Sequence, residues 1–178
     1  NAGHILGSAS IEIEVQDADG SKVHIMFSGD VGPDEKVFYR QPEGPAGFDY
    51  ILSESTYGGR ERVDYTLESR RNSLRDVVNT ALARGGNLVI PTFAVERSQE
   101  LLHDFGYLIK EKQINPSVVF LDSPLASKVT AVYKKYASMF ADSELSADEL
   151  FNDPRFRIIE AVQDSKAINS IRGGAIIM

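Results

Sequence analysis

The stretch "NLVIPTFAVERSQELLHDFGYLIKEKQINPSVVFLD" (residues 87–122) sets the fold class of this chain. It begins with an apolar run, continues through a polar loop into a segment with helical periodicity, and ends in a second apolar run. The helical segment carries its apolar side chains at Leu101, Leu102, Phe105, Leu108 and Ile109. A strand, a helix and a strand in succession predict a βαβ unit, in which the two strands lie parallel in one sheet.

The same alternation continues on both sides of this unit. Upstream, Thr66 is placed to cap a helix that ends at the Gly85-Gly86 pair, a common helix stop signal. Downstream, further elements are predicted around residues 129–136, 156–160, 165–171 and 174–178. The sequence therefore predicts an α/β domain with a mostly parallel sheet flanked by helices.

The first third of the chain follows a different pattern, in which apolar and polar side chains alternate. The alternation runs over residues 11–15 and 23–27, and an Asp-Gly pair between them is a hairpin turn signal. Strict alternation is typical of half-buried strands. We therefore predict a domain division, with a β-rich segment over residues 1–58 and the α/β domain over residues 59–178.

The composition excludes several classes of protein. With 42% hydrophobic and 25% charged residues among 178, the chain is globular rather than disordered. Its apolar runs are too short to span a bilayer and no secretion signal is visible, so we expect no membrane association. The absence of cysteine excludes disulfides and thiolate zinc sites. A net charge of -7 argues against a broad basic surface for nucleic acid, although a local basic pocket is still compatible.

Two residues in glycine-containing turns could bind a metal ion. His4 lies in "GHILGS", before the first predicted strand, and Asp30 lies in "SGDVG", after the second. If these strands pair as a hairpin, both residues lie at the same edge of the sheet. Imidazole and carboxylate are the ligand types that zinc accepts without thiolates. From spacing alone, however, an ordinary turn histidine and turn aspartate are the favoured interpretation.

The remaining candidates do not complete a zinc site, which takes three protein ligands when it is catalytic. His24 alternates with apolar neighbours and His103 lies off the apolar face of its helix, so both are predicted to be solvated surface residues. Glu54 directly follows the apolar run "YILS", which predicts a strand end beside His4 and Asp30. A structural turn carboxylate explains Glu54 equally well.

The loops "PTFAVERSQE" and "LDSPLAS" each connect a predicted strand to a predicted helix. Such loops lie at the carboxyl edge of a parallel sheet, where ligands bind, and helix N-termini favour anions. Arg97 and Ser123 in these loops are therefore candidates to hold phosphates. The ordinary structural interpretations are individually stronger: an ion pair of Arg97 with Glu96 or Glu100, and Ser123 as the N-cap of the next helix.

Six stretches together, in this order, match a known family: "GHILGSA", "FSGDVG", "ESTYGGR", "IPTFAVERSQELL", "LDSPLA" and "SKAIN…GGAIIM". The chain resembles the metallo-β-lactamase-fold RNA-processing nucleases of the β-CASP group, and looks most similar to bacterial relatives of the cleavage-and-polyadenylation endonuclease. The resemblance implies a partial metallo-β-lactamase domain over residues 1–58 and a β-CASP domain, truncated at its C-terminal end, over residues 59–178. The family's "HxHxDH" cluster lies upstream of this sequence and its later ligands lie downstream, so we expect the chain to be a central segment.

The resemblance also implies roles for individual residues. His4 matches a histidine metal ligand, and Asp30 matches the aspartate that bridges two zinc ions. Glu54 matches the acidic residue that opens the β-CASP segment and supports the metal-site histidines, so Asp30 and Glu54 are the expected catalytic residues. The resemblance does not assign phosphate contacts to Arg97 or Ser123; those rest on their positions at helix starts.

The implied function is that of a zinc-dependent ribonuclease with two zinc ions and single-stranded RNA as its substrate, located in the cytoplasm. Endonucleolytic and exonucleolytic action are both compatible. We expect the 178-residue chain alone to be inactive and to bind zinc weakly. Phe93 and Tyr57 are candidates for base stacking, with core or loop packing the stronger interpretation.

Two other functions remain open: a non-catalytic nucleic-acid-binding or scaffold member of the family, and a nuclease of the same superfamily that acts on DNA. An intact upstream "HxHxDH" cluster favours the enzyme over the scaffold. The first third would lack strands with which it normally pairs, and exposed strand edges invite pairing with another copy. We therefore expect a non-native or homodimeric edge contact.

Overall fold

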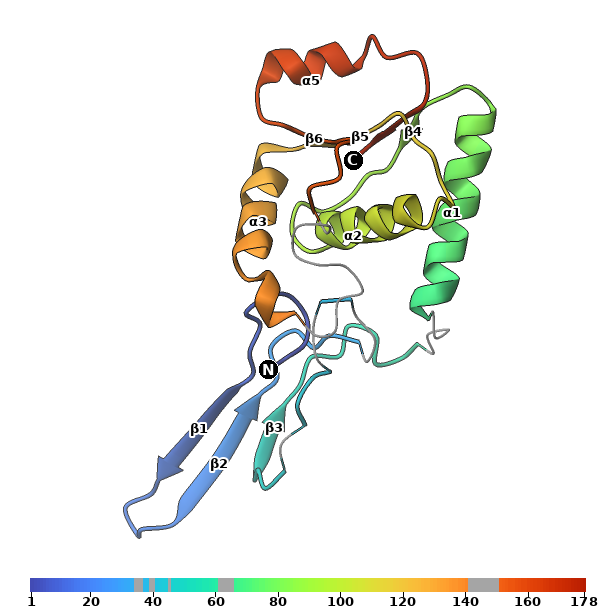
Figure 1. Cartoon of the computed structure of the whole chain (residues 1–178). Coiled ribbons are helices and arrows are strands. Elements are labelled where there is room, and N and C mark those ends of the chain that lie inside the picture. The colour runs from blue at the N-terminus through green and yellow to red at the C-terminus, as the bar shows by residue number, and fades with distance from the viewer. Residues whose placement is uncertain (34–36, 39–40, 45, 61–65, 141–150) are drawn as a thin grey trace. The chain divides into compact units, whose positions relative to one another are not determined.

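The structure is a computed structural model of the 178-residue chain, and it describes all residues except 34–36, 39–40, 45, 61–65 and 141–150 (Figure 1). The chain divides into two compact units, Asn1–Asp64 and Tyr65–Met178. The assignment of residues 1–58 and 59–178 to two family domains stays a prediction.

The Asn1–Asp64 unit contains a three-stranded sheet in the order β1-β2-β3. The strands are β1 (Ile11–Gln16), β2 (Lys22–Phe27) and β3 (Tyr50–Leu52). β1 and β2 pair antiparallel, whereas β3 runs parallel to β2. The hairpin turn is closed by the Asp17 amide, which donates to the Ser21 carbonyl over 2.8 Å, and Gly20 takes the left-handed conformation with φ +85°. The predicted hairpin is thus confirmed.

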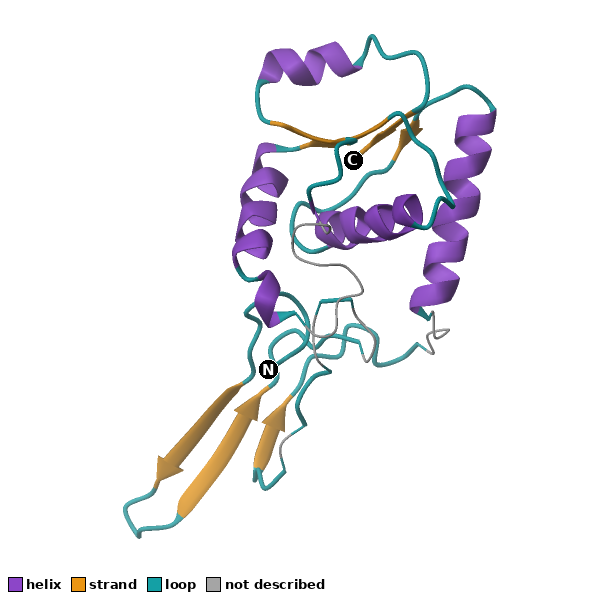
Figure 2. Ribbon diagram, in the orientation of Figure 1, coloured by secondary structure: helices purple, strands orange, loops and turns teal. Residues whose placement is uncertain are grey.

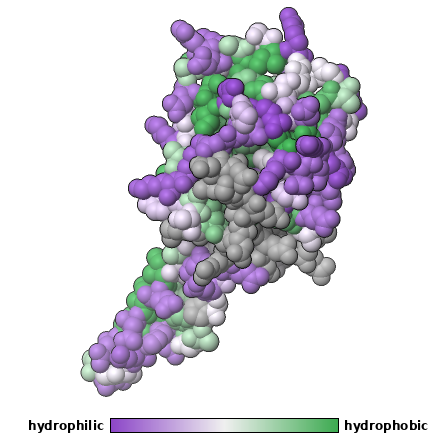
Figure 3. Space-filling view, in the orientation of Figure 1, coloured by the Kyte–Doolittle hydropathy of each residue, from purple (hydrophilic) through white to green (hydrophobic). Residues whose placement is uncertain are grey.

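One face of this sheet is apolar; it is exposed on β1 and β3 and partly buried over the middle of β2. The register places Ile13 of β1 opposite Ile25 of β2, and Ile25 opposite Tyr50 of β3. Every residue of β1 is exposed, so the prediction of a half-buried strand is wrong in this respect. Burial of an alternating strand requires a second layer on its apolar face, and no described residue of the unit buries β1. Figure 3 shows hydrophobic and hydrophilic residues side by side on the surface of this sheet.

The Tyr65–Met178 unit has the predicted α/β organisation, with a four-stranded sheet in the order β4-β7-β5-β6. All neighbouring strands of this sheet run parallel. In chain order the elements are α1 (Leu67–Ala83), β4 (Leu88–Val89), α2 (Arg97–Lys110), β5 (Val118–Asp122), α3 (Pro124–Lys135), η1 (Ala137–Met139), β6 (Phe156–Ile159), α5 (Val162–Ile168) and β7 (Ala175–Ile177). Figure 2 shows α5 on one side of the sheet and α2 and α3 on the other.

The signals that bound the first helix act as predicted. The Thr66 hydroxyl accepts a hydrogen bond from the Ser69 amide over 3.1 Å, which satisfies one free N–H of the first turn. Beyond the end of α1, Gly85 adopts φ +70°. The apolar run that follows forms a strand of only two residues, Leu88–Val89, because β4 is an edge strand and Pro91 has no N–H for further pairing.

The core of this unit lies between α2 and the sheet. Its apolar side chains come from α2 and from the two central strands: Leu102, Phe105, Leu108, Val119, Leu121 and Ile176 are all buried. Close packing of such side chains fixes α2 against the strands. The loops that leave β4 and β5 at their carboxyl ends are thereby held over one edge of the sheet.

Candidate functional site

Glycines allow the loop that carries Asp30 to approach the loop that carries His4. A Cβ added to Gly32 would lie 1.7 Å from the Gly3 carbonyl oxygen, so no other residue fits without moving the backbone. The Gly32 amide donates to the Ala2 carbonyl over 2.8 Å and closes this contact. The glycine-rich sequence on both sides of the two residues therefore has a structural reason.

His4 and Asp30 converge in the structure. The Nε2 atom of His4 lies 3.8 Å from the Oδ2 atom of Asp30, and the two side chains are 38% and 78% exposed. Two ligands of one tetrahedral zinc ion, each at its usual distance from the ion, lie about 3.4 Å apart. The observed separation is close to that value, and it is also that of an ion pair when the histidine is protonated. The predicted proximity is confirmed, whereas the role of the two residues as metal ligands stays a prediction.

Glu54, directly after the β3 run, fixes the backbone next to Asp30. Its Oε1 atom accepts a hydrogen bond from the amide of Val31 over 2.7 Å, and its Oε2 atom accepts one from the Thr56 hydroxyl over 2.7 Å. The Glu54 amide in turn donates to the hydroxyl of Ser28, which is buried. Both carboxylate oxygens of Glu54 therefore accept hydrogen bonds from the protein. The bond to the Val31 amide places Glu54 where it can orient the neighbouring Asp30.

These contacts lower the pKa of Glu54 below its ordinary value of 4.5. The hydrogen bond from the Thr56 hydroxyl is the largest cause, the amide of Val31 is the next, and the nearby His4 adds a smaller electrostatic effect. Glu54 therefore stays ionised at neutral pH, as a carboxylate that accepts from two donors must.

We predict that Thr56→Val raises the pKa of Glu54 toward its ordinary value, because it removes the largest cause of the shift. A depressed folded-state pKa stabilises the unit above the unfolded value, and this stabilisation disappears as the pH falls through the folded value. In both proteins the loss begins near the unfolded-state pKa; in the variant it is smaller and is complete at a higher pH, because the folded-state pKa is higher. An NMR titration of the side-chain carboxyl carbon measures the pKa. Ser53→Ala is the control, because the Ser53 hydroxyl donates to the backbone carbonyl of Glu54 and, among the described contacts, not to its carboxylate. An unchanged pKa in Thr56→Val would contradict the assignment.

His4 and Asp30 are suited to be two ligands of a metal ion, but they do not make a complete site. Within the described part of the chain, no group of three or more His, Cys, Asp or Glu side chains is arranged to hold a metal ion. Both oxygens of the Glu54 carboxylate accept hydrogen bonds from protein donors.

The two other histidines differ from each other. His24 lies at the surface, as predicted, with its Nε2 atom 3.1 Å from Oε2 of Glu14. The prediction of a surface position for His103 is wrong, because this residue is 1% exposed on α2. Periodicity marks only one apolar face on α2, whereas α2 is buried on most of its circumference and takes polar side chains into the interior.

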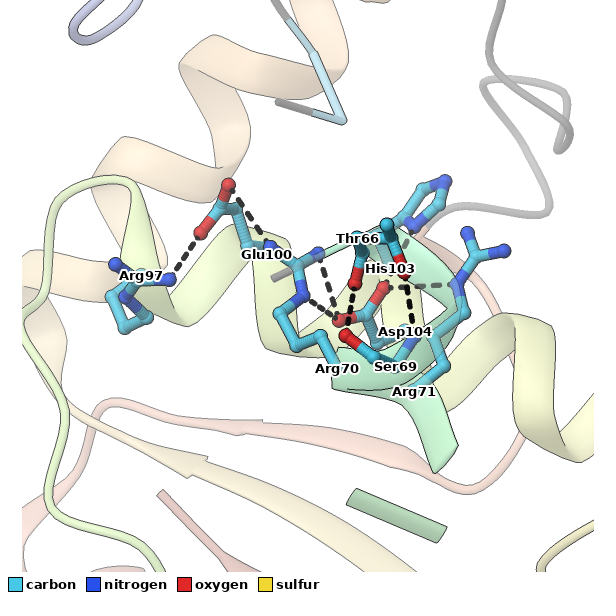
Figure 4. A network of polar contacts seen from close by, with 8 residues as sticks. All are labelled: Thr66, Ser69, Arg70, Arg71, Arg97, Glu100, His103 and Asp104. Atoms are coloured by element: carbon cyan, nitrogen blue, oxygen red, sulfur yellow. Dashed lines mark hydrogen bonds and ion pairs between the residues drawn. The ribbon is translucent and has the colours of Figure 1, made fainter. Parts of the chain in front are cut away.

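His103 belongs to a buried polar cluster between α1 and α2 that the sequence did not indicate (Figure 4). At its centre, Asp104 accepts a hydrogen bond from Nε of Arg70 over 2.9 Å and one from Nε of Arg71 over 3.3 Å. The Arg71 guanidinium also lies 3.8 Å from the ring centre of Tyr107. Only the burial of Arg71 had a signal in the sequence. Arg71 precedes the buried Val78 by two helical turns and therefore lies on the same face of α1.

The same cluster holds Arg97. The buried Glu100 accepts a hydrogen bond from Nη1 of Arg97 over 2.7 Å, and its other oxygen lies 3.6 Å from Nη1 of Arg70 (Figure 4). This is one of the two ion pairs that the sequence offered as the ordinary structural interpretation of Arg97. Because the Arg97 side chain is still 55% exposed, its guanidinium is held at one end and accessible at the other.

Ser123 has the structural role that the sequence offered for it. Its hydroxyl accepts a hydrogen bond from the Ala126 amide over 3.2 Å and caps α3, with Pro124 at the first helical position. Arg97 and Ser123 both begin helices that follow strands of the parallel sheet, so both lie at its carboxyl edge. The contacts described for the two residues do not link them. A role in phosphate binding stays a prediction for both.

None of the described helices combines the length and the apolar character needed to cross a membrane. Residues 98–178 match the family model of the Beta-Casp domain.

Three relatives cover most of this chain. It is 33% identical to "Ribonuclease TTHA0252" of Thermus thermophilus, over 99% of this chain and 40% of that protein. It is 30% identical to the cleavage and polyadenylation specificity factor subunit 3 of Dictyostelium discoideum, over 100% of this chain and 22% of that protein. It is 32% identical to an RNase J-like protein of Methanocaldococcus jannaschii, over 76% of this chain and 31% of that protein. The chain thus spans less than half the length of these relatives.

Proposed function

Because this chain belongs to the β-CASP family of metallo-β-lactamase-fold RNA nucleases, we propose that the whole protein hydrolyses phosphodiester bonds of single-stranded RNA. The observation that carries the proposal is the convergence of His4 and Asp30, with Nε2 and Oδ2 3.8 Å apart. An imidazole and a carboxylate that meet at an exposed loop edge are suited to hold a metal ion for metal-assisted hydrolysis.

The family is metal-dependent, and we propose zinc as the metal, with two ions in the whole protein. His4 and Asp30 are the residues of this chain that would hold them, through an imidazole nitrogen and carboxylate oxygens. Bound zinc supplies an activated water at neutral pH and neutralises charge on the reacting phosphate.

Glu54 is proposed to position Asp30 rather than to react. Its carboxylate holds the amide of Val31, the residue directly after Asp30, and is itself fixed by the Thr56 hydroxyl. Such supporting contacts commonly change metal affinity or activity by about 10- to 100-fold when they are lost. The low pKa of Glu54 keeps this support in place throughout the neutral range.

Arg97 and Ser123 are proposed to bind RNA phosphates at the carboxyl edge of the parallel sheet. The guanidinium of Arg97 has five N–H donors, and the contact with Glu100 leaves its exposed end able to meet a phosphate. The hydroxyl of Ser123 accepts from the Ala126 amide and can donate at the same time. Two such contacts supply local positive potential and hydrogen bonding in a chain whose net charge is -7.

Cleavage of labelled RNA by the whole protein tests the proposed function. We expect a single-stranded RNA to be cut, a DNA of the same sequence to stay intact, and the cutting to stop in excess chelator and return with added zinc. The chelator result separates metal-assisted hydrolysis from contamination by a metal-independent ribonuclease. An RNA that stays intact, or cutting that continues at the same rate in chelator, would show that the proposal is wrong.

A further inference from the structure

Phe93 is an aromatic residue whose side chain is exposed to solvent and not buried in the core. It lies in the loop between β4 and α2, and its 83% exposure is the highest of any large apolar side chain in the described part of the chain. A single exposed apolar residue is ordinary on a protein surface. The contacts of this loop, however, hold the backbone of Phe93 in place while its ring stays in solvent.

Two buried polar side chains hold the loop. The amide and the hydroxyl of Ser98 both donate to the Phe93 carbonyl, over 3.2 and 2.7 Å. The side-chain amide of Gln99 donates to the Ala94 carbonyl over 3.2 Å and to the Thr130 hydroxyl on α3 over 3.0 Å. Ser98 and Gln99 are almost completely buried. The interior of the unit therefore fixes the direction in which Phe93 leaves the loop.

The turn that ends the loop brings a cation into the same short segment. Glu96 adopts φ +67° and ψ −63°, the conformation of a γ-turn that the Arg97 amide closes by donating to the Val95 carbonyl over 2.9 Å, and α2 begins at Arg97. The Arg97 guanidinium is held by Glu100 and half exposed. One short segment, whose backbone is held by buried side chains, thus exposes an aromatic ring and a guanidinium that are four residues apart in the sequence.

We propose that Phe93 stacks on an unpaired base of the RNA strand whose phosphate Arg97 contacts. This inference rests on the proposed function and specifies its substrate, an RNA with exposed bases and no required sequence. An aromatic ring can stack on every base, and a duplex hides the base faces that the ring needs. The held backbone favours this contact because the loop itself does not have to be ordered when RNA binds.

The test measures binding of fluorescent oligouridine to the whole protein in an Asp30→Asn background, in which the proposed function predicts no cleavage. We expect Phe93→Ala and Phe93→Leu to weaken binding by about 5- to 100-fold, and Phe93→Tyr and Phe93→Trp to stay close to the parent. Phe93→Leu keeps an apolar side chain but removes the aromatic ring, so it separates stacking from simple apolar contact. Val162→Ala on α5 is the matched control, because Val162 is also an exposed apolar residue and its loss should not affect binding.

Two further measurements separate this inference from the proposed function. Arg97→Ala should reduce the slope of log affinity against log salt by about 0.7, whereas Phe93→Ala should leave the slope unchanged. An oligonucleotide that lacks bases should bind the parent and Phe93→Ala equally. The parent in these measurements is the Asp30→Asn protein. If the parent binds RNA, Arg97→Ala weakens that binding and Phe93→Ala leaves it unchanged, the stacking proposal is overturned and the proposed function stands. If the parent does not bind RNA, both are overturned.

Discussion

Asp104→Ala is expected to destabilise the Tyr65–Met178 unit by about 3–5 kcal/mol. Asp104 is almost fully buried and accepts hydrogen bonds from both Arg70 and Arg71. Its removal takes a carboxylate partner from the buried Arg71 guanidinium, and water cannot replace that partner in the packed interior between α1 and α2. Urea denaturation of the 178-residue chain, followed by circular dichroism, measures the loss.

An exposed pair of the same residue types on α1 provides the control. Asp76 contacts Arg75 over 2.8 Å, and its side chain is largely exposed. Asp76→Ala should therefore cost less than about 1 kcal/mol, because water screens the pair and solvates Arg75 after the change. Equal effects of the two substitutions would contradict the role of burial in the cluster.

A double variant distinguishes a charge effect from lost packing. Arg71→Met with Asp104→Leu removes both charges of the most buried pair, while Arg70 is partly exposed and still faces Glu100, so the loss should be smaller than the sum of the single losses. If the double variant is at least as unstable as that sum, packing rather than charge compensation would explain the cluster.

His4→Ala is expected to lower the rate of RNA cleavage by the whole protein by about 10³-fold. The substitution removes the imidazole that faces Asp30 over 3.8 Å, and with it a ligand of the proposed metal site. The double variant with Asp30→Ala should be about as inactive as either single variant, since both residues act through the same metal. Single-turnover kinetics on a labelled RNA give these rates.

His24→Ala is the matched control for this measurement. His24 belongs to the same unit and has a similar exposure, but its partner is Glu14 on the neighbouring strand. Its removal should leave the cleavage rate within about twofold, as is usual for a surface substitution. Equal losses for His4→Ala and His24→Ala would point to damage of the sheet and not of a metal site.

The sequence predicted those features that depend on local signals. Thr66 and Gly85 bound α1 because capping and left-handed turns need particular residues at particular positions. The convergence of His4 and Asp30 followed from one tertiary assumption, the hairpin of β1 and β2, because a hairpin returns the chain to the edge at which it began. The parallel sheet followed from the alternation of strands and helices.

The features that were missed depend on which elements come to lie together. Asp104 contacts Arg70 and Arg71 across 34 and 33 residues of sequence, so no local pattern relates them. His103 is buried because other elements cover nearly all faces of α2, which its periodicity did not show. Phe93 has the apolar character of a core residue, and only the buried hydrogen bonds of its loop explain its exposure.

In the proposed function, His4 and Asp30 hold the metal that RNA cleavage requires. The most direct test measures bound zinc and cleavage rate on the same samples of the whole protein: the parent, Asp30→Asn, and Glu12→Gln, which removes an exposed carboxylate from β1 of the same unit. We predict that zinc content and rate fall together in Asp30→Asn and are unchanged in Glu12→Gln. An Asp30→Asn protein that keeps both its zinc and its cleavage rate would contradict the claim.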